Sequence, residues 1–160
     1  MSFNLIIQQI RDVKNSGRDQ GTRFEEIVRI YLLHEPEYKT QYKNVVLWKD
    51  WDKRTSGDTG IDLVAEMSDG SGFVAVQCKC YNEDHKIQKS DIDSFLAASS
   101  KKGFVRRILV VTTDLGKNAE DAILNQNPPV HVIGLSDLEN CRIDWNEYFR
   151  NNKIRLKPAK

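Results

Sequence analysis

Three polar side chains on two expected β-strands are the groups of this chain best placed to do chemistry. Two segments rich in branched apolar and aromatic residues, 61–66 and 73–80, are separated by the turn-forming sequence Ser-Asp-Gly-Ser-Gly. This pattern predicts a β-hairpin. Asp62 lies on the first strand, and Gln77 and Lys79 lie on the second. Because side chains alternate between the faces of a strand, Gln77 and Lys79 must point to the same face.

The charge of Lys79 needs a partner. A lysine on so apolar a strand is costly to bury unless an anion accompanies it. Asp62 could supply part of that partnership and a phosphate the rest, whereas a structural Asp–Lys pair between neighbouring strands is the alternative. The other face of the second strand is expected to be core, and it carries Val74, Val76, Cys78 and Cys80.

Composition limits the class of protein. The chain has 160 residues, 39% hydrophobic and 29% charged, as expected for one globular domain with a proper core. Its net charge of +1 means that any affinity for nucleic acid must come from a local basic patch or a bound metal. Three cysteines without metal-site spacing indicate a reducing, cytoplasmic compartment with neither disulfide nor zinc. We find no signal peptide, membrane-spanning run or P-loop, and therefore expect no membrane contact and no ATPase activity in this segment.

The remaining elements predict an α/β sandwich around a mixed sheet. Thr22 with Glu25, and Ser90 with Asp93, have the spacing of capping boxes and are expected to begin two of the helices. Ser136 is expected to cap a later helical turn. The helices are predicted over 3–14, from 22, from 90 to about 102 and over 118–124. The strands are predicted over 45–48, 61–66, 73–80, 107–112 and 130–133, the fourth of them apolar throughout and therefore covered on both faces.

Glu25 falls at the edge of the apolar stripe of its helix, which contains Phe24, Ile27 and Val28. It could therefore reach past the core toward the hairpin, whereas Glu26 should face water. The alternative is that Glu25 serves only in the capping box.

Basic residues lie on both sides of the hairpin. Lys49, Lys53 and Arg54 alternate with Trp48 and Trp51 in and beside the polar loop 49–57, a composition that suits contact with backbone phosphates. A solvated connection is the alternative for this loop. Two further candidate phosphate ligands occur in the polar crossover 81–89, namely Lys86 and Lys89.

An Asp, a short hairpin and then Gln-x-Lys resemble the active site of the PD-(D/E)XK nuclease superfamily, in the branch where Gln replaces the second acid. Gly60-Ile61-Asp62-Leu63 and Val76-Gln77-Cys78-Lys79 are similar to the Mrr-like restriction endonucleases, and Gly21 to Glu26 resemble that family's first helix. The chain is most similar to the N-terminal nuclease domain of type ISP restriction–modification enzymes. The motifs cover about residues 21–113, and a weaker resemblance extends to residue 145. The resemblance implies a restriction-endonuclease-like three-layer sandwich, with a central mixed β-sheet flanked by helices.

The resemblance also implies a Mg²⁺-dependent DNA endonuclease without intrinsic sequence specificity. Asp62, the Gln77 side chain and the main-chain carbonyl of Cys78 would hold Mg²⁺, which prefers oxygen ligands and keeps several of its waters. Lys79 would orient the attacking water and stabilise the phosphate charge. Glu25 would hold a further water or a second ion.

One such centre cuts one strand of double-stranded DNA, so a second nuclease copy would be needed to break both. We expect residues 1–150 to form the nuclease domain and 151–160 to be a basic linker without a packed terminus. The linker would lead to a helicase-like region, which would use ATP, and to a methyltransferase. The alternatives are a non-catalytic DNA-binding or scaffolding domain, a Holliday-junction resolvase and an RNA nuclease. The joint presence of Asp62, Gln77 and Lys79 argues against the first, and the net charge of +1 argues against a resolvase.

Overall fold

The computed structural model describes residues 3–12, 17–55 and 59–158, with the side chains of 17–22 left out. Its elements follow one another as α1 (Phe3–Asp12), α2 (Gly17–His34), α3 (Pro36–Lys39), β1 (Tyr42–Leu47), the 3₁₀ helix η1 (Trp48–Asp50), β2 (Leu63–Met67), β3 (Phe73–Lys79), α4 (Lys89–Ser99), β4 (Phe104–Val111), α5 (Lys117–Ile123), β5 (Val130–Ile133), α6 (Leu135–Glu139) and α7 (Trp145–Asn151).

The centre of the molecule is a five-stranded mixed sheet in the order β1-β2-β3-β4-β5. The first three strands pair antiparallel, and β3, β4 and β5 pair parallel. A hairpin joins β2 to β3, whereas α4 provides the longer crossover that a parallel β3–β4 pair requires. The predicted mixed sheet is therefore confirmed.

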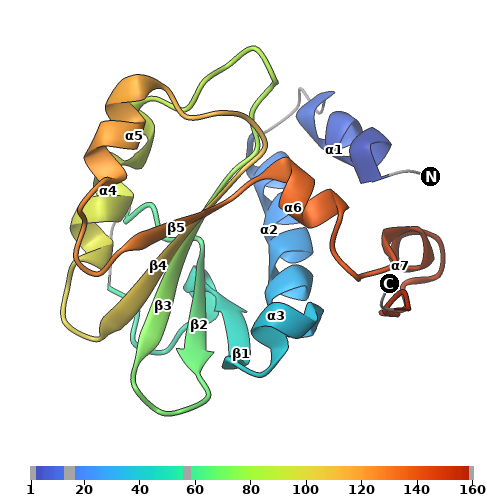
Figure 1. The fold of residues 1–160 in the computed structure, drawn as a ribbon, viewed down its shortest axis with the longest axis horizontal. Coiled ribbons are helices and arrows are strands. Elements are labelled where there is room, and N and C mark those ends of the chain that lie inside the picture. Colours follow the sequence, from blue (N-terminus) through green and yellow to red (C-terminus); the bar gives the residue numbers. More distant parts are fainter. Residues whose placement is uncertain (1–2, 13–16, 56–58, 159–160) are drawn as a thin grey trace.

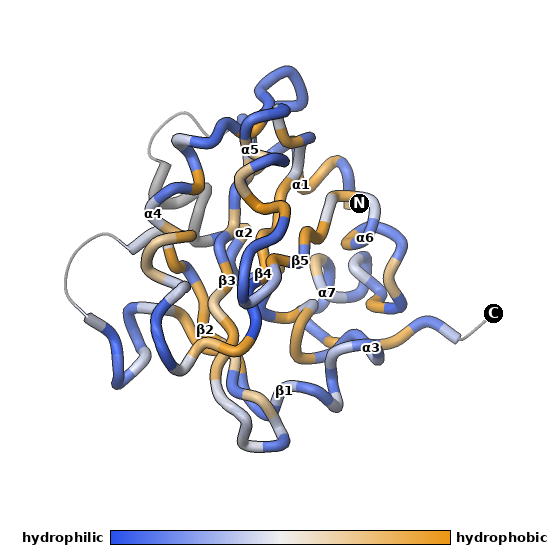
Figure 2. Tube along the Cα trace, turned by 60° about the vertical axis from the view of Figure 1, so that its left-hand side comes forward, coloured by the Kyte–Doolittle hydropathy of each residue, from blue (hydrophilic) through white to orange (hydrophobic). Residues whose placement is uncertain are grey.

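Helices cover both faces of this sheet, as Figure 1 shows. The larger core lies on the α2 side and takes in Val74, Val76 and Val110, together with side chains of α1, α2 and α7. On the α4 and α5 side, two smaller clusters contain Ala75 and Leu109 among other residues. Neighbouring strand residues thus alternate between the two cores, and apolar positions gather along the strands while most loops are hydrophilic (Figure 2). The expected three-layer α/β sandwich is confirmed.

The hairpin forms where its turn residues predict it. Val64 lies opposite Ala75 in antiparallel register. The tight turn is closed by the Met67 N–H, which donates to the Gly72 carbonyl over 3.0 Å. Gly70 has φ of +77°, a conformation that costs glycine little. The predicted hairpin is therefore confirmed.

Several element boundaries differ from the sequence predictions. Helix α2 begins at Gly17, so Thr22 lies inside it and is not its N-cap. Helix α4 begins at Lys89, with Gln88 as N-cap and Asp91 accepting the Gln88 N–H over 2.7 Å. Ser90 and Asp93 therefore do not form the capping box. Both Gln88–Asp91 and Ser90–Asp93 have the required spacing, and only the path of the incoming chain selects between them.

Smaller corrections concern strand ends and the cap of α6. Strand β1 stops at Leu47, and Trp48 begins η1. Strand β4 begins at Phe104, three residues before the predicted start at 107, because its pairing with β3 extends that far. Helix α6 begins after Gly134, whose N–H donates to Asp137 over 2.9 Å, so Ser136 is not its N-cap.

The segment after α7 is not an unpacked tail. Leu156 forms an antiparallel bridge with Ile143 and packs against the larger core. The Asp144 N–H donates to the Arg155 carbonyl over 2.8 Å. The prediction of a linker that leaves the body directly after Asn151 is therefore wrong for residues 155–157.

In the part of the chain that the structure describes, no helix is both long and apolar enough to cross a lipid bilayer.

Candidate active site

The main chain of Asp62 is held from both sides at the end of the hairpin. Its N–H donates to the Val76 carbonyl over 2.8 Å, and its carbonyl accepts the Trp48 N–H over 2.9 Å. Its carboxylate Oδ2 accepts the Cys78 N–H over 2.7 Å. The bonds to Val76 and Cys78 bracket Gln77 on β3, so Asp62 faces Gln77 where the β2–β3 pairing ends. The Asp62 carboxylate acts as the acceptor where a main-chain carbonyl would otherwise be, and this bond fixes its position.

Gln77 is buried, with 3% of its surface exposed. Within the described residues its Oε1 atom has no hydrogen-bond partner. A buried acceptor left without a partner costs about 1–3 kcal/mol. A cation or a water molecule bound beside Asp62 would remove this cost.

Gly60 is a supporting residue to which the sequence analysis gave no role of its own. It has φ of +71°, and a Cβ at this position would lie 2.9 Å from the Phe95 main-chain nitrogen and 3.2 Å from Gln77 Nε2. Any other residue here would be strained and would push against both α4 and Gln77. The sequence feature that could have indicated this role is the position of the glycine, two residues before Asp62 at the start of a strand.

Glu25 approaches the same place from α2, on the opposite side of the sheet from α4. The pKa of Glu25 is raised to about 7, chiefly by burial and also by the nearby negative charge of Asp62, while the positive charge of Lys49 lowers it in part. Since α2 begins at Gly17, Glu25 is not at the third position of the helix, and the capping-box alternative is wrong. The structure thus brings Glu25 close to Asp62, as the edge position on its helix predicted.

Lys79 ends β3, two residues beyond Gln77 and on the same face. It is half-buried, and its Nζ lies 5.8 Å from the centre of the Tyr81 ring. Tyr81 is held in turn by Thr112, whose Oγ1 accepts the Tyr81 N–H over 2.9 Å and donates to the Tyr81 carbonyl over 2.8 Å. The Arg11 Nε of α1 also donates to the Tyr81 carbonyl, over 2.8 Å. The chain that follows Lys79 is therefore anchored to both β4 and α1.

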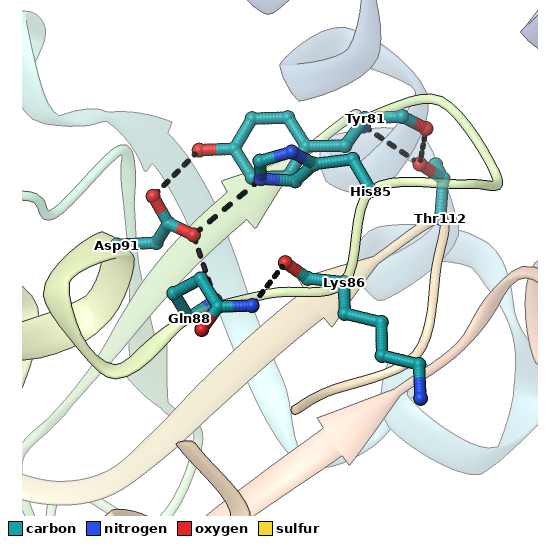
Figure 3. A network of polar contacts seen from close by, with 6 residues as sticks. All are labelled: Tyr81, His85, Lys86, Gln88, Asp91 and Thr112. Atoms are coloured by element: carbon teal, nitrogen blue, oxygen red, sulfur yellow. Dashed lines mark hydrogen bonds and ion pairs between the residues drawn. The ribbon is translucent and has the colours of Figure 1, made fainter. Parts of the chain in front are cut away.

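A polar network extends from Tyr81 toward α4 (Figure 3). The Tyr81 ring packs edge-on against His85, and its hydroxyl donates to Asp91 over 3.5 Å. His85 Nε2 lies 3.7 Å from the other oxygen of Asp91. His85 is exposed and belongs to this network at the surface, consistent with the absence of any ligand spacing around it.

The oxygen donors at this site suit a hard cation. Asp62 and Glu25 contribute carboxylates, Gln77 contributes an amide oxygen, and Cys78 has a main-chain carbonyl on the same strand. Burial raises the pKa of the Cys78 thiol well above its ordinary value, so the thiol itself is a poor ligand. Among the described residues no group of three or more His, Cys, Asp or Glu side chains could hold a metal. Oxygen donors suit Mg²⁺, which needs few protein ligands, better than zinc, whose protein sites favour nitrogen and sulfur.

The basic residues expected to contact DNA are divided between different surfaces. Lys49, in η1, is exposed and close enough to Glu25 to lower its pKa. Lys53 lies over the Phe73 ring, 4.6 Å from its centre, at the turn end of the hairpin. Arg54 Nη1 donates to the Trp51 carbonyl over 3.0 Å. Of these three cations, Lys49 lies near Glu25, whereas Lys53 lies at the turn end of the strands.

The two basic residues of the crossover lie elsewhere. Lys86 lines a hollow at the carboxyl ends of β4 and β5. Lys89 forms an exposed ion pair with Asp93 over 2.9 Å on the first turn of α4. A surface pair of this kind contributes little to stability, and it remains available for exchange with a phosphate.

The comparisons with known proteins agree with this architecture. A family model described as a restriction endonuclease matches residues 33–155. No curated protein sequence matches the chain. Among solved structures, the ATP-dependent type ISP restriction-modification enzyme LlaBIII bound to DNA is 34% identical with a TM-score of 0.80. The match covers all of this chain and 10% of that one, so the chain spans about a tenth of the length of that enzyme.

Two other restriction enzymes share the fold. The MspJI restriction endonuclease in complex with an oligonucleotide is 19% identical with a TM-score of 0.59, over 84% of this chain and 30% of that one. The DNA modification-dependent restriction endonuclease AspBHI is 17% identical with a TM-score of 0.58, over 84% of this chain and 33% of that one. Because the family model spans most of the sequence, this chain belongs to the restriction endonuclease family.

Proposed function

We propose that this chain is a Mg²⁺-dependent DNA endonuclease domain that hydrolyses one phosphodiester bond per active site. The observation that carries the proposal is the position of Asp62 opposite Gln77 at the end of the hairpin, where Gln77 Oε1 is buried without a hydrogen-bond partner among the described residues and the charge of Asp62 acts on Glu25. An oxygen-rich, partly desolvated spot with a lysine beside it suits phosphoryl transfer, which requires positioning and charge neutralisation more than covalent chemistry.

Each side chain has a role in this reaction. Asp62, Gln77 Oε1 and the Cys78 carbonyl would hold the cation, and Asp62 is kept in place by its bond to the Cys78 N–H. Lys79 would orient the attacking water and neutralise charge on the phosphate. Glu25, with a pKa of about 7, can exchange a proton with water near neutral pH. When bound, Mg²⁺ supplies positive charge to the reacting phosphate and favours ionisation of water.

DNA would be bound through its backbone. The net charge of +1 leaves local cations to make the phosphate contacts, and Lys49 is near enough to Glu25 to lower its pKa. Lys53, Arg54, Lys86 and Lys89 would contact phosphates more distant from the bond that is cut. Contacts of this kind carry no base sequence, so we propose that the domain has no sequence specificity of its own.

The domain would act as part of a larger restriction–modification enzyme in the cytoplasm. The 34% identity to LlaBIII, of which this chain covers a tenth, supports such an arrangement. A helicase-like region that uses ATP and a methyltransferase would then lie downstream. Breaking both DNA strands would require a second nuclease copy, because one centre cuts one strand.

Two substitutions test the proposal. Asp62→Asn, which keeps an oxygen acceptor for the Cys78 N–H, and Lys79→Ala should each abolish Mg²⁺-dependent nicking of supercoiled plasmid while shifting the thermal unfolding midpoint little. Lys39→Ala, which changes an exposed lysine of α3, is the matched control and should cleave normally. Cleavage by Lys79→Ala protein at the parental rate would refute the mechanism. Unfolding of both site variants would instead support the structural ion pair.

The assay should include RNA and a four-way DNA junction as substrates and should be repeated in any longer natural protein that contains this chain. Faster cleavage of either alternative substrate would replace the DNA endonuclease assignment. No cleavage of any substrate in any of these settings would favour the non-catalytic scaffold.

A further inference from the structure

A second concave site lies on the α4 side of the hairpin, beside the main chain of Asp62. It has a volume of about 340 Å³, and its walls include the rings of Trp48, Trp51, Phe73 and Phe104. The Trp51 ring centre lies 5.2 Å from that of Phe73 and 5.7 Å from that of Phe104. Aromatic side chains that pack on one another and still line a hollow provide flat apolar faces for a planar guest.

The charged side chains in the described lining of this hollow are all cations. Lys53, Lys101 and Lys102 line it, and its described lining residues include no acid. Lys53 is held over the Phe73 ring, whereas Lys101 and Lys102 are exposed in the turn between α4 and β4. An uncharged apolar guest would leave these cations without a partner. The combination favours a guest that has both a flat aromatic part and an anionic part.

We infer that this aromatic hollow binds an unpaired nucleotide of a DNA strand, with the base against Trp51 and the adjoining phosphates on Lys101 and Lys102. Every base has a π-face, so binding by stacking tolerates sequence, and lysines beside the rings suit the backbone. Binding of a DNA strand in the hollow does not depend on the proposed nuclease function. The use of that binding in cleavage rests on it.

The hollow is connected to the candidate active site. Trp48 lines it and also donates its N–H to the Asp62 carbonyl over 2.9 Å, and Ile61 lines it next to Asp62 in sequence. Phe73 lies four residues before Gln77 on β3, which corresponds to about 13 Å along a strand. About four bases span that length at about 3.4 Å each. A strand held here would therefore enter the active site a few nucleotides from the cut, with one base out of the stack.

The test measures binding of a labelled oligodeoxythymidylate of about 10 nucleotides by fluorescence anisotropy, with a chelator present so that no cleavage occurs. A duplex of the same length is the comparison. Trp51→Leu should weaken binding of the single strand about five- to a hundredfold, because loss of one stacked base costs that much, and Trp51→Phe should lose less. The double variant Lys101→Ala with Lys102→Ala should reduce the magnitude of the salt slope by about 1.4.

Controls separate folding and catalysis from the inference. Lys39→Ala with Lys153→Ala removes two exposed cations outside the lining of the hollow and should leave the salt slope unchanged. Because binding is measured with a chelator and without cleavage, a failure of the nuclease mechanism would not imitate a failure here. The exposed lysine pair keeps the test valid if Trp51→Leu unfolds.

Two results would overturn the inference. One is equal affinity for duplex and single strand, since a duplex has no free base to stack. The other is single-strand binding that is unchanged in the Trp51 and the double lysine variants, which would show that the strand does not bind in the hollow.

Discussion

Replacing Glu25 by Gln should stabilise the metal-free protein near pH 8 and leave its stability unchanged near pH 4. The substitution keeps the shape of the side chain and removes only its ability to ionise. Burial, with the charge of Asp62 added and that of Lys49 opposing, raises the pKa of Glu25 to about 7 in the folded protein. The folded state therefore retains this proton over a pH range in which the unfolded chain has already lost it.

The sign and size follow from this difference. Between about pH 4.5 and about pH 7 the unfolded state binds fewer protons at Glu25, so this residue makes the free energy of unfolding fall as the pH rises. The difference between the two pKa values would correspond to about 3 kcal/mol, at about 1.36 kcal/mol for each tenfold change. Because the carboxyl is partly exposed to water, we expect Glu25→Gln to add about 1–2 kcal/mol near pH 8.

The assay is equilibrium urea unfolding of parent and variant at several pH values, with a chelator present. Glu26→Gln is the matched control, because Glu26 is the next residue on α2 and forms a surface pair with Arg29 over 3.3 Å. That substitution should change stability by less than about 0.5 kcal/mol at every pH. A gain from Glu25→Gln that does not vary with pH, or a loss near pH 8, would show that the carboxylate is not destabilised by burial beside Asp62.

Three further substitutions test how the site is supported. Gly60→Ala should lose about 1–3 kcal/mol in urea unfolding and lower the nicking rate, because its Cβ would press on Phe95 and Gln77 at a positive φ. Arg107→Ala should lower the thermal midpoint through a loss of about 2–4 kcal/mol, since this fully buried guanidinium donates to main-chain carbonyls of α4 and of the loop before β5. Arg11→Ala should lose about 1–2 kcal/mol and speed amide exchange just after β3, because it removes donors to carbonyls that follow β3 and β4.

Much of the fold was predictable because its signals are local. The apolar run from Ile108 to Val111 is buried, as a strand covered on both faces must be. Arg107, which the sequence placed at the start of that strand, is nonetheless fully buried. No local rule predicts this, since the carbonyls that its guanidinium meets come from two distant segments.

The candidate site also combines features that local sequence patterns predicted with features that they did not. Alternation along β3 predicted that Gln77 and Lys79 share a face, and the helix period placed Glu25 at the edge of its apolar stripe. The roles of these residues in catalysis remain predictions. The distribution of the basic residues was not foreseeable, because Lys49 and Lys53 are four positions apart in a polar segment whose path depends on Trp51 packing against the hairpin.

The sequence by itself determined the hairpin, the faces of its strands and the order of helices and strands, because residue periodicity and turn chemistry act between near neighbours. Only the tertiary structure decided that Gln88 and not Ser90 caps α4. It alone also decided that Gly60 must leave room for Phe95, and that Leu156 packs against the core. It also decided that the Glu25 carboxyl lies near enough to Asp62 for the charge of Asp62 to raise its pKa. Each of these depends on segments far apart in the chain, whose approach is set by the packing of whole helices against the sheet.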